Sequence, residues 1–277
     1  MNSNLKINSF LLLILLITSL TVSLGGNYTV IMSDTHMKFV SPELVSAYQQ
    51  SVINASNPTR EKIYKKLFSI HESNNQILWK TIQGEEHLLV ARFIEDKGGN
   101  SIPIDQKDIW GTIFPQLYEF CSNYMAKHPQ AKLPDLGLRI SQLLGLPADR
   151  VGFKVVEFWA KPSDIFRPCP DVEITDEQCD INIPENITSE HSFWFNRLRA
   201  ISYADGYKNL EYGGYPWTQL GYSYDWSPES KDHVGLSEYV VRKGSKIYIQ
   251  SINSIDEYCK RRSVASIAIN LRYVRKT

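Results

Sequence analysis

Apolar residues that alternate with polar ones, or gather in short runs, predict strands at several places along the chain. The runs cover residues 28–32, 76–82, 87–94, 108–114 and 151–160. Gln83 and Gly84 separate two of them, which indicates a β-hairpin. Residues 236–241 and 246–251 predict a second hairpin across 242–245, and the alternation over 264–274 predicts a closing strand.

Between these strands, apolar residues at helical spacing predict helices. The ranges with this spacing are 58–71, 115–124, 135–144 and 189–201. In the second range Leu117, Cys121 and Tyr124 share one helical face. Cys121 is therefore expected on the buried side of that helix.

The predicted helices and strands are mixed, without the regular strand–helix alternation of a doubly wound parallel sheet. This order favours an α+β fold, in which a mostly antiparallel sheet carries helices packed on one face. No internal repeat or long low-complexity linker divides the chain. We therefore expect residues 26–277 to form a single globular domain, stabilised by disulfides.

Residues 1–25 have the three parts of an export signal. Lys6 supplies a positive charge, residues 10–20 form an apolar run, and Ser23 and Gly25 provide small residues ahead of a cleavage site. The apolar run is shorter than the roughly 20 residues that a bilayer span needs. We expect cleavage of this segment, no stable membrane span afterwards, and a secreted or periplasmic location.

The charges balance overall but are unevenly distributed. Lys and Arg number 30, as do Asp and Glu, and this neutrality argues against a dedicated nucleic-acid binder. Residues 164–190 contain eight acids and one Arg, whereas residues 242–277 contain nine Lys or Arg and two acids. These regions are either solvated or close together. Alternatively, the basic region binds phosphates or acidic glycans.

The four cysteines are expected to form two disulfides, because their number is even and the chain is expected to be exported. Of the three possible connectivities we favour Cys169–Cys179, which closes a short loop, together with Cys121–Cys259. A four-cysteine metal site requires closely spaced pairs, and the sequence contains none. We expect neither a metal nor another cofactor.

The aromatic-rich stretch 212–241 is the strongest candidate for a binding site. Flat rings with hydroxyl or indole donors suit a glycan, a peptide or another envelope component. The same rings can instead fill the core, which is the more common use of such residues. The candidate ligand-binding residues are Tyr215, Trp217, Tyr222, Tyr224 and Trp226.

The same stretch contains candidates for an extracytoplasmic hydrolase. His233 would act as a general acid or base, assisted by Asp225 or Glu238, because a carboxylate can tune the pKa of a nearby imidazole toward neutrality. In the alternative interpretation His233 lies in an exposed turn, and Glu238 forms a salt bridge with a basic hairpin. The sequence alone does not show the burial that a functional pKa shift requires.

The acidic loop that follows residue 162 could bind Ca²⁺ through clustered carboxylates. Its acids are Asp171, Glu173, Asp176, Glu177 and Asp180. They lack the spacing of the helix-loop-helix calcium site, so a solvated loop closed by a disulfide is the expected structure.

Asn-X-Ser/Thr sequences begin at Asn27, Asn54 and Asn186. Such sequences accept N-linked glycans in hosts that glycosylate exported proteins.

Three segments resemble uncharacterised exported proteins of bacteria. They read FRPCPD at 166–171, YPWTQLGYSYDW at 215–226 and GLSEYVV at 235–241. The similarity covers the region from Phe158 to Tyr239. It brings no known activity and assigns no role to a residue.

Overall fold

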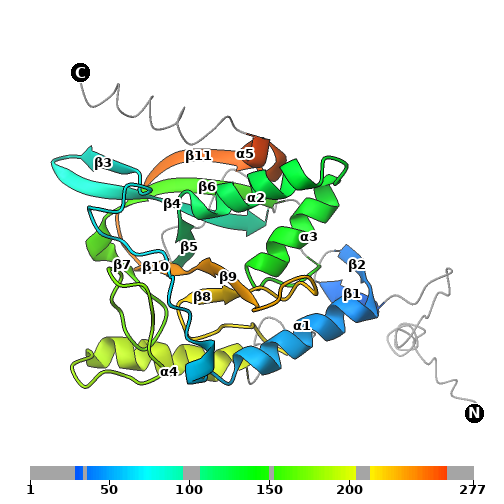
Figure 1. The fold of residues 1–277 in the computed structure, drawn as a ribbon, viewed down its shortest axis with the longest axis horizontal. Coiled ribbons are helices and arrows are strands. Elements are labelled where there is room, and N and C mark those ends of the chain that lie inside the picture. Colours follow the sequence, from blue (N-terminus) through cyan, green and yellow to red (C-terminus); the bar gives the residue numbers. More distant parts are fainter. Residues whose placement is uncertain (1–28, 34–35, 96–106, 150–152, 204–212, 261–277) are drawn as a thin grey trace, which may run out of the picture.

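The computed structural model describes residues 29–33, 36–95, 107–149, 153–203 and 213–260 (Figure 1). The expected export signal and the expected strand at 264–274 lie outside these residues. Within them, no helix is both long and apolar enough to cross a membrane.

A seven-stranded sheet lies at the centre of the fold, and all of its strand pairs are antiparallel. The strand order is β11-β6-β4-β5-β10-β7, with β3 paired to β4. This confirms the predicted α+β class. The strands are β3 (Trp79–Ile82), β4 (Glu85–Glu95), β5 (Ile109–Ile113), β6 (Phe153–Ala160), β7 (Ile165–Phe166), β10 (Tyr239–Val241) and β11 (Tyr248–Ser254).

The β3–β4 hairpin turns at Gln83 and Gly84, as predicted. Both residues have positive φ, 53° and 82°. A two-residue turn with positive φ at both positions matches the right-handed twist of the strands that it joins. Two smaller sheets pair β1 (Thr29–Ser33) with β2 (His36–Val40), and β8 (Tyr222–Tyr224) with β9 (Val234–Ser237).

One face of the sheet is covered by α2 (Gln116–Lys127), α3 (Leu133–Leu143) and α5 (Ile255–Lys260). Leu89 and Ala91 of β4 and Trp159 of β6 are buried against these helices. Burying apolar side chains contributes roughly 1.5–3 kcal/mol for each large residue, which makes this layer a main source of stability.

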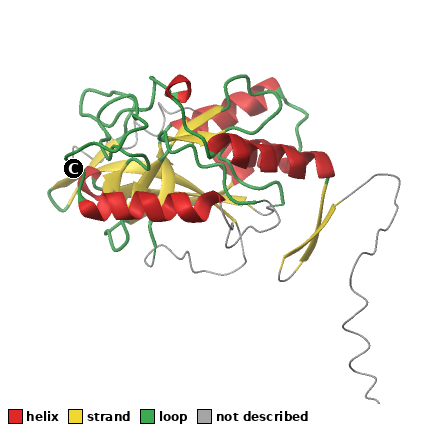
Figure 2. Cartoon of the chain, turned by 90° about the horizontal axis from the view of Figure 1, so that it is seen from below, coloured by secondary structure: helices red, strands yellow, loops and turns green. Residues whose placement is uncertain are grey.

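The other face is covered mainly by irregular chain. Leu88 and Val90 of β4 pack there with Ile70 and Ile77, which precede β3. Two further helices, α1 (Pro42–Ala55) and α4 (Ser189–Tyr203), lie beside each other below the sheet in Figure 1. They are therefore in front of the sheet when the molecule is seen from below (Figure 2). Short 3₁₀ turns occur at Arg60–Lys62 and Pro162–Asp164.

The predicted helix over 58–71 is wrong. The segment contains only a 3₁₀ turn, and its apolar residues serve different layers: Leu67 packs near the Cys169–Cys179 disulfide, and Ile70 packs on the sheet. The backbone N–H groups of Leu67 and Ile70 donate to carbonyls of the acidic loop, at 2.8 and 2.7 Å. Tertiary hydrogen bonds therefore replace those of a helix.

The helix of this region lies earlier, at α1. Its start carries a signal that sequence analysis did not use: Ser41 is the N-cap, its hydroxyl accepts from the N–H of Leu44 at 3.4 Å, and Pro42 follows as the first helical residue.

The predicted hairpin of 236–241 with 246–251 is also wrong. β10 pairs with β5 and β7, whereas β11 pairs with β6 at one edge of the sheet. Tyr239 lies opposite Gly111, and Tyr248 lies opposite Trp159. The two strands are neighbours in sequence, but each joins a different part of the sheet.

Both predicted disulfides are confirmed. Cys121 of α2 is bonded to Cys259 of α5, across 138 residues of sequence, and Cys169 is bonded to Cys179, across 10 residues. All four side chains are buried. The long-range bond fixes α2 to α5 within the layer that covers the sheet.

Replacing Cys121 and Cys259 together by Ala is expected to lower the free energy of unfolding by about 5 kcal/mol, because the crosslink restricts a long loop of the unfolded chain. The matched replacement of Cys169 and Cys179 removes a short loop and should cost about 3 kcal/mol. Guanidinium unfolding followed by Trp fluorescence measures both. A larger loss for the short-loop variant would contradict this origin of the stability.

Candidate functional site

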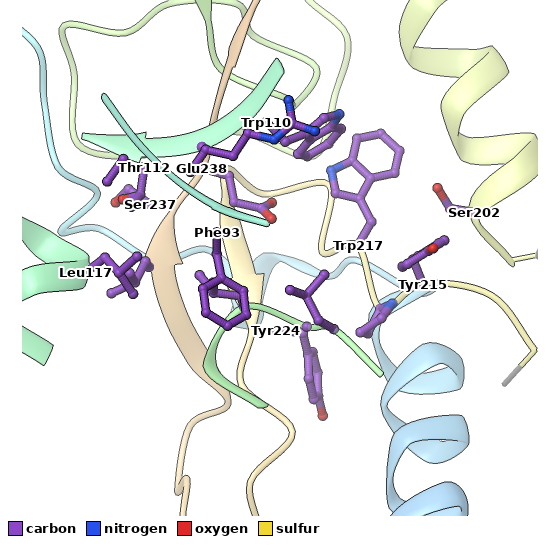
Figure 3. A pocket seen from close by; sticks show the side chains of 18 of the residues that line it. Phe93, Trp110, Thr112, Leu117, Ser202, Tyr215, Trp217, Tyr224, Ser237 and Glu238 are labelled. Carbon is purple, nitrogen blue, oxygen red and sulfur yellow. The ribbon is translucent and has the colours of Figure 1, made fainter. Parts of the chain in front are cut away.

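A cavity of about 510 Å³ opens where the helical layer ends, between β4, β5, α4 and the chain from Tyr215 to Glu238 (Figure 3). This volume is within the range of roughly 300–1,000 Å³ typical of small-molecule sites. Most of its lining is apolar. The lining residues used below are Arg92, Phe93, Trp110, Leu198, Tyr215, Trp217, Tyr224 and Glu238.

Three tryptophans pack together beside the cavity. The ring of Trp110 lies 6.2 Å from that of Trp194 and 6.5 Å from that of Trp217. Both partner indoles are held by hydrogen bonds: Trp194 donates to the Asp108 carboxylate at 2.7 Å, and Trp217 donates to the Pro168 carbonyl at 3.2 Å. Rings with satisfied donors and packed faces give this wall a fixed shape.

The turn after α3 forms another part of the wall. Gly145 ends this helix with φ +64°, as expected for a glycine in this position. Its carbonyl accepts from the buried Tyr48 hydroxyl at 3.3 Å, which ties the turn to α1. The hydroxyl of Tyr48 also reaches the Gly214 carbonyl at 3.3 Å, so one phenol holds two segments that border the cavity.

Glu238 lies between β9 and β10, and hydrogen bonds on either side fix the backbone around it. Its N–H donates to the Gly221 carbonyl at 2.9 Å, and the N–H of Ser237 donates to Oε1 of Gln116 at 3.2 Å. The side chain of Tyr239 packs on the sheet face that Leu88 and Val90 also cover, away from the helical layer. The alternation of side chains therefore turns Glu238 toward the cavity, where Figure 3 shows its carboxylate among Phe93, Trp110 and Trp217.

The carboxylate of Glu238 has no protein counter-ion within the described residues. The residue as a whole is half-buried, but its Oε2 atom is closed to solvent and accepts no hydrogen bond from them. Burial raises the pKa of Glu238 to about 8. Most of the population is therefore protonated at neutral pH, which is the usual response of a carboxyl group to an apolar site.

Arg92 is the second charged residue in the lining. It lies in β4 within the apolar run HLLVARFI and is half-buried. Burial lowers its pKa. Over the part of the chain that the structure describes, neither an ion pair nor a hydrogen bond joins the side chain of Arg92 to Glu238 or to another residue.

The structure divides the five candidate aromatic residues between cavity and core. Tyr215, Trp217 and Tyr224 line the cavity. Tyr222 is buried near the Cys169–Cys179 disulfide and donates to the Lys62 carbonyl at 2.9 Å, while Trp226 packs edge-on against Tyr48. Core filling therefore holds for Tyr222 and Trp226, whereas ligand binding by the other three residues stays a prediction.

The three candidate catalytic residues do not form one side-chain network. The Asp225 carboxylate is buried and accepts two hydrogen bonds from the Arg139 guanidinium, at 3.0 and 2.6 Å. Nδ1 of His233 lies 2.9 Å from the backbone carbonyl of Asp225, and the His233 ring stacks on Tyr224. Only Glu238 lines the cavity. The salt bridge considered for Glu238 is not among the described contacts.

The acidic loop brings ligand atoms of Asp171, Glu173 and Asp176 within 4.8 Å of one another. Asp176 also forms an ion pair with Arg167, which is buried. A protein cation therefore already compensates part of this negative charge.

Arg92, Trp110 and Leu198 line the cavity but are not among the site residues predicted from the sequence. A signal existed for Arg92, since a charged residue inside an apolar strand run is unusual. Trp110 and Leu198 have no comparable signal, because their sequence patterns are those of ordinary strand and helix residues.

Comparisons with known proteins give no further guidance: no family model, no curated protein and no solved structure matches this chain.

Arg139→Met is expected to lower the free energy of unfolding by about 3–5 kcal/mol, because it leaves the buried Asp225 carboxylate without its partner. Adding Asp225→Asn should restore part of the loss, since the uncompensated charge disappears. Urea unfolding measures both variants. A double variant no more stable than Arg139→Met would show that the ion pair is not the source of the effect.

Glu238→Gln should flatten the pH dependence of stability. The pKa of Glu238 is raised from 4.5 to about 8 on folding. Between these values the folded protein keeps a proton that the unfolded chain loses, so stability falls as pH rises through the interval. The variant should match wild type near pH 4 and exceed it near pH 9 by on the order of a few kcal/mol.

Urea unfolding at a series of pH values tests this expectation. Glu119→Gln, at an exposed position of α2, serves as the control and should keep the wild-type profile. Parallel profiles for wild type and Glu238→Gln would contradict the raised pKa.

Proposed function

We propose that this protein is an extracytoplasmic binding protein whose cavity takes a compact, largely apolar ligand. The observation that carries the proposal is a cavity of small-molecule size with aromatic walls and a half-buried carboxyl group that has no partner among the described residues. The two disulfides support an oxidising compartment. Tyr215, Trp217 and Tyr224 supply part of the binding surface.

Among the ligand classes considered from the sequence, the cavity favours an apolar peptide segment or a similar small molecule over a glycan. A glycan needs many hydrogen-bonding partners, whereas Phe93, Trp110 and Leu198 offer mostly apolar surface. Burying such surface on binding contributes roughly 25 cal/mol per Å² before the costs of association.

The second candidate function is acid–base catalysis by Glu238. It is favoured by the pKa of this residue, about 8, because a group that titrates near the working pH can both accept and donate a proton. His233 and Asp225 would have no direct part in it, since neither lines the cavity. A Glu238→Gln variant that hydrolyses any identified substrate as fast as wild type would exclude this role.

The binding proposal is tested with the neutral apolar dye N-phenyl-1-naphthylamine, whose fluorescence rises in an apolar site. Wild type should bind it saturably. Leu198→Trp places a larger side chain in the cavity and should weaken binding about tenfold or more, equivalent to ~1.4 kcal/mol.

The matched control is Phe193→Trp, on the same helix. Phe193 is 70% exposed and does not line the cavity, so this variant should bind like wild type. Unchanged dye binding by a folded Leu198→Trp protein, or no saturable binding by wild type, would overturn the proposal.

A further inference from the structure

The cavity lining includes one basic and one acidic side chain, and neither has a protein partner among the described residues. Arg92 and Glu238 are the only charged residues among the described residues of its lining. We infer that the ligand is zwitterionic, with an ammonium group for Glu238, a carboxylate for Arg92 and an apolar body between them. Amino acids and short peptides with free termini have this chemistry. The inference rests on the proposed binding function.

The first support for this inference is that other buried charged groups in the same fold have ion-pair partners. Asp225 is held by Arg139 with two hydrogen bonds, and Arg167 is paired with Asp176. Leaving a buried charge uncompensated costs several kcal/mol, so proteins ordinarily pair or neutralise it. At the cavity, by contrast, Arg92 is half-buried without an ion-pair partner among the described residues, and the Oε2 atom of Glu238 is closed to solvent and accepts no hydrogen bond from them.

The second support is that a ligand charge can compensate each group without separating an existing pair. No ion pair joins Arg92 to Glu238 among the described contacts, so a ligand would not have to break one. An ammonium group placed among aromatic rings also gains cation–π attraction, and Trp110 and Trp217 offer such rings. A guanidinium, in turn, binds a carboxylate through two parallel hydrogen bonds.

Charge balance also predicts a proton movement. Free Glu238 is largely protonated at neutral pH, and a neighbouring ammonium group favours its ionised form. Binding therefore releases the Glu238 proton to solvent. The other titratable groups at the site are the phenols of Tyr203, Tyr215 and Tyr224. Burial raises the pKa of Tyr203 and Tyr224, so both stay neutral.

A monovalent ligand would satisfy only part of this arrangement. A ligand with an ammonium group but no carboxylate would leave Arg92 without a ligand partner and would place a second cation near it. An acid without an amine would pair with Arg92 and leave Glu238 protonated, with only a hydrogen bond to offer. These two cases make separate predictions for ligands that carry one charge.

The experiment uses four forms of one dipeptide, leucyl-phenylalanine, as competitors of N-phenyl-1-naphthylamine. The forms are the free dipeptide, its C-terminal amide, its N-acetyl derivative and the doubly blocked compound. Phenylalanine in the same four forms tests a shorter separation of the charges. In at least one series the free form should displace the dye at a concentration about tenfold or more below that of the blocked form.

Two variants assign each charge to its residue. With Glu238→Gln, ligands with a free amine should no longer displace the dye better than their N-acetyl forms, but a free carboxylate should still improve displacement. With Arg92→Gln, a free carboxylate should no longer improve displacement, but a free amine should. Circular dichroism and cooperative urea unfolding verify that both variants are folded, and the dye affinity of each variant is measured so that displacement is expressed relative to it. Proton release, measured by calorimetry in buffers of different ionisation enthalpy, should accompany binding of the free form to wild type and vanish in Glu238→Gln.

The outcomes separate this inference from the binding function on which it rests. Dye binding to wild type, combined with equal displacement by the free and doubly blocked forms in both series, would overturn the zwitterionic ligand and leave the binding function standing. Equal displacement by a singly charged form and the free form would also overturn it. Absence of saturable dye binding to the wild-type protein would overturn the binding function itself.

Discussion

The burial of β4 on both faces is the constraint on which the rest of the structure depends. Leu89 and Ala91 face the helical layer, whereas Leu88 and Val90 face the irregular chain that precedes β3. A strand buried in this way needs two covers, and the chain supplies them from segments far apart in sequence. Phe93, further along β4, packs against the core of the helical layer and also lines the cavity. The cavity is also bordered by α4 and the aromatic stretch.

Several charged side chains in the interior are held by hydrogen bonds or ion pairs. Glu157 lies in a strand run as apolar as that around Arg92, and its carboxylate accepts from the Ser251 hydroxyl at 2.6 Å. Partnered groups of this kind add specificity to a core, because only one packing satisfies them. Arg92 and Glu238 have no such partners within the described residues. We propose that a ligand supplies these partners.

The sequence predicted the parts of the fold that depend on local rules. The Gln83-Gly84 turn, the helix containing Cys121 and both disulfides follow from turn chemistry, helical spacing and cysteine positions. The errors arose where tertiary contacts decide the structure. The backbone of Leu67 is hydrogen-bonded to the acidic loop, and β10 pairs with β5 rather than with β11. The cavity was predicted in part: the aromatic stretch supplies several of its walls, but no pattern in the sequence reveals that Arg92 and Leu198 meet it.

The bond between Cys121 and Cys259 has a consequence for biosynthesis. The helical cover of the sheet is assembled from residues of α2 and α3 together with Ile255, Tyr258 and Cys259. Until the last of these leaves the ribosome, the apolar stripe of α2 lacks one of its neighbours. The nascent chain must therefore stay unaggregated with this stripe uncovered, and the disulfide can form only after Cys259 has been synthesised.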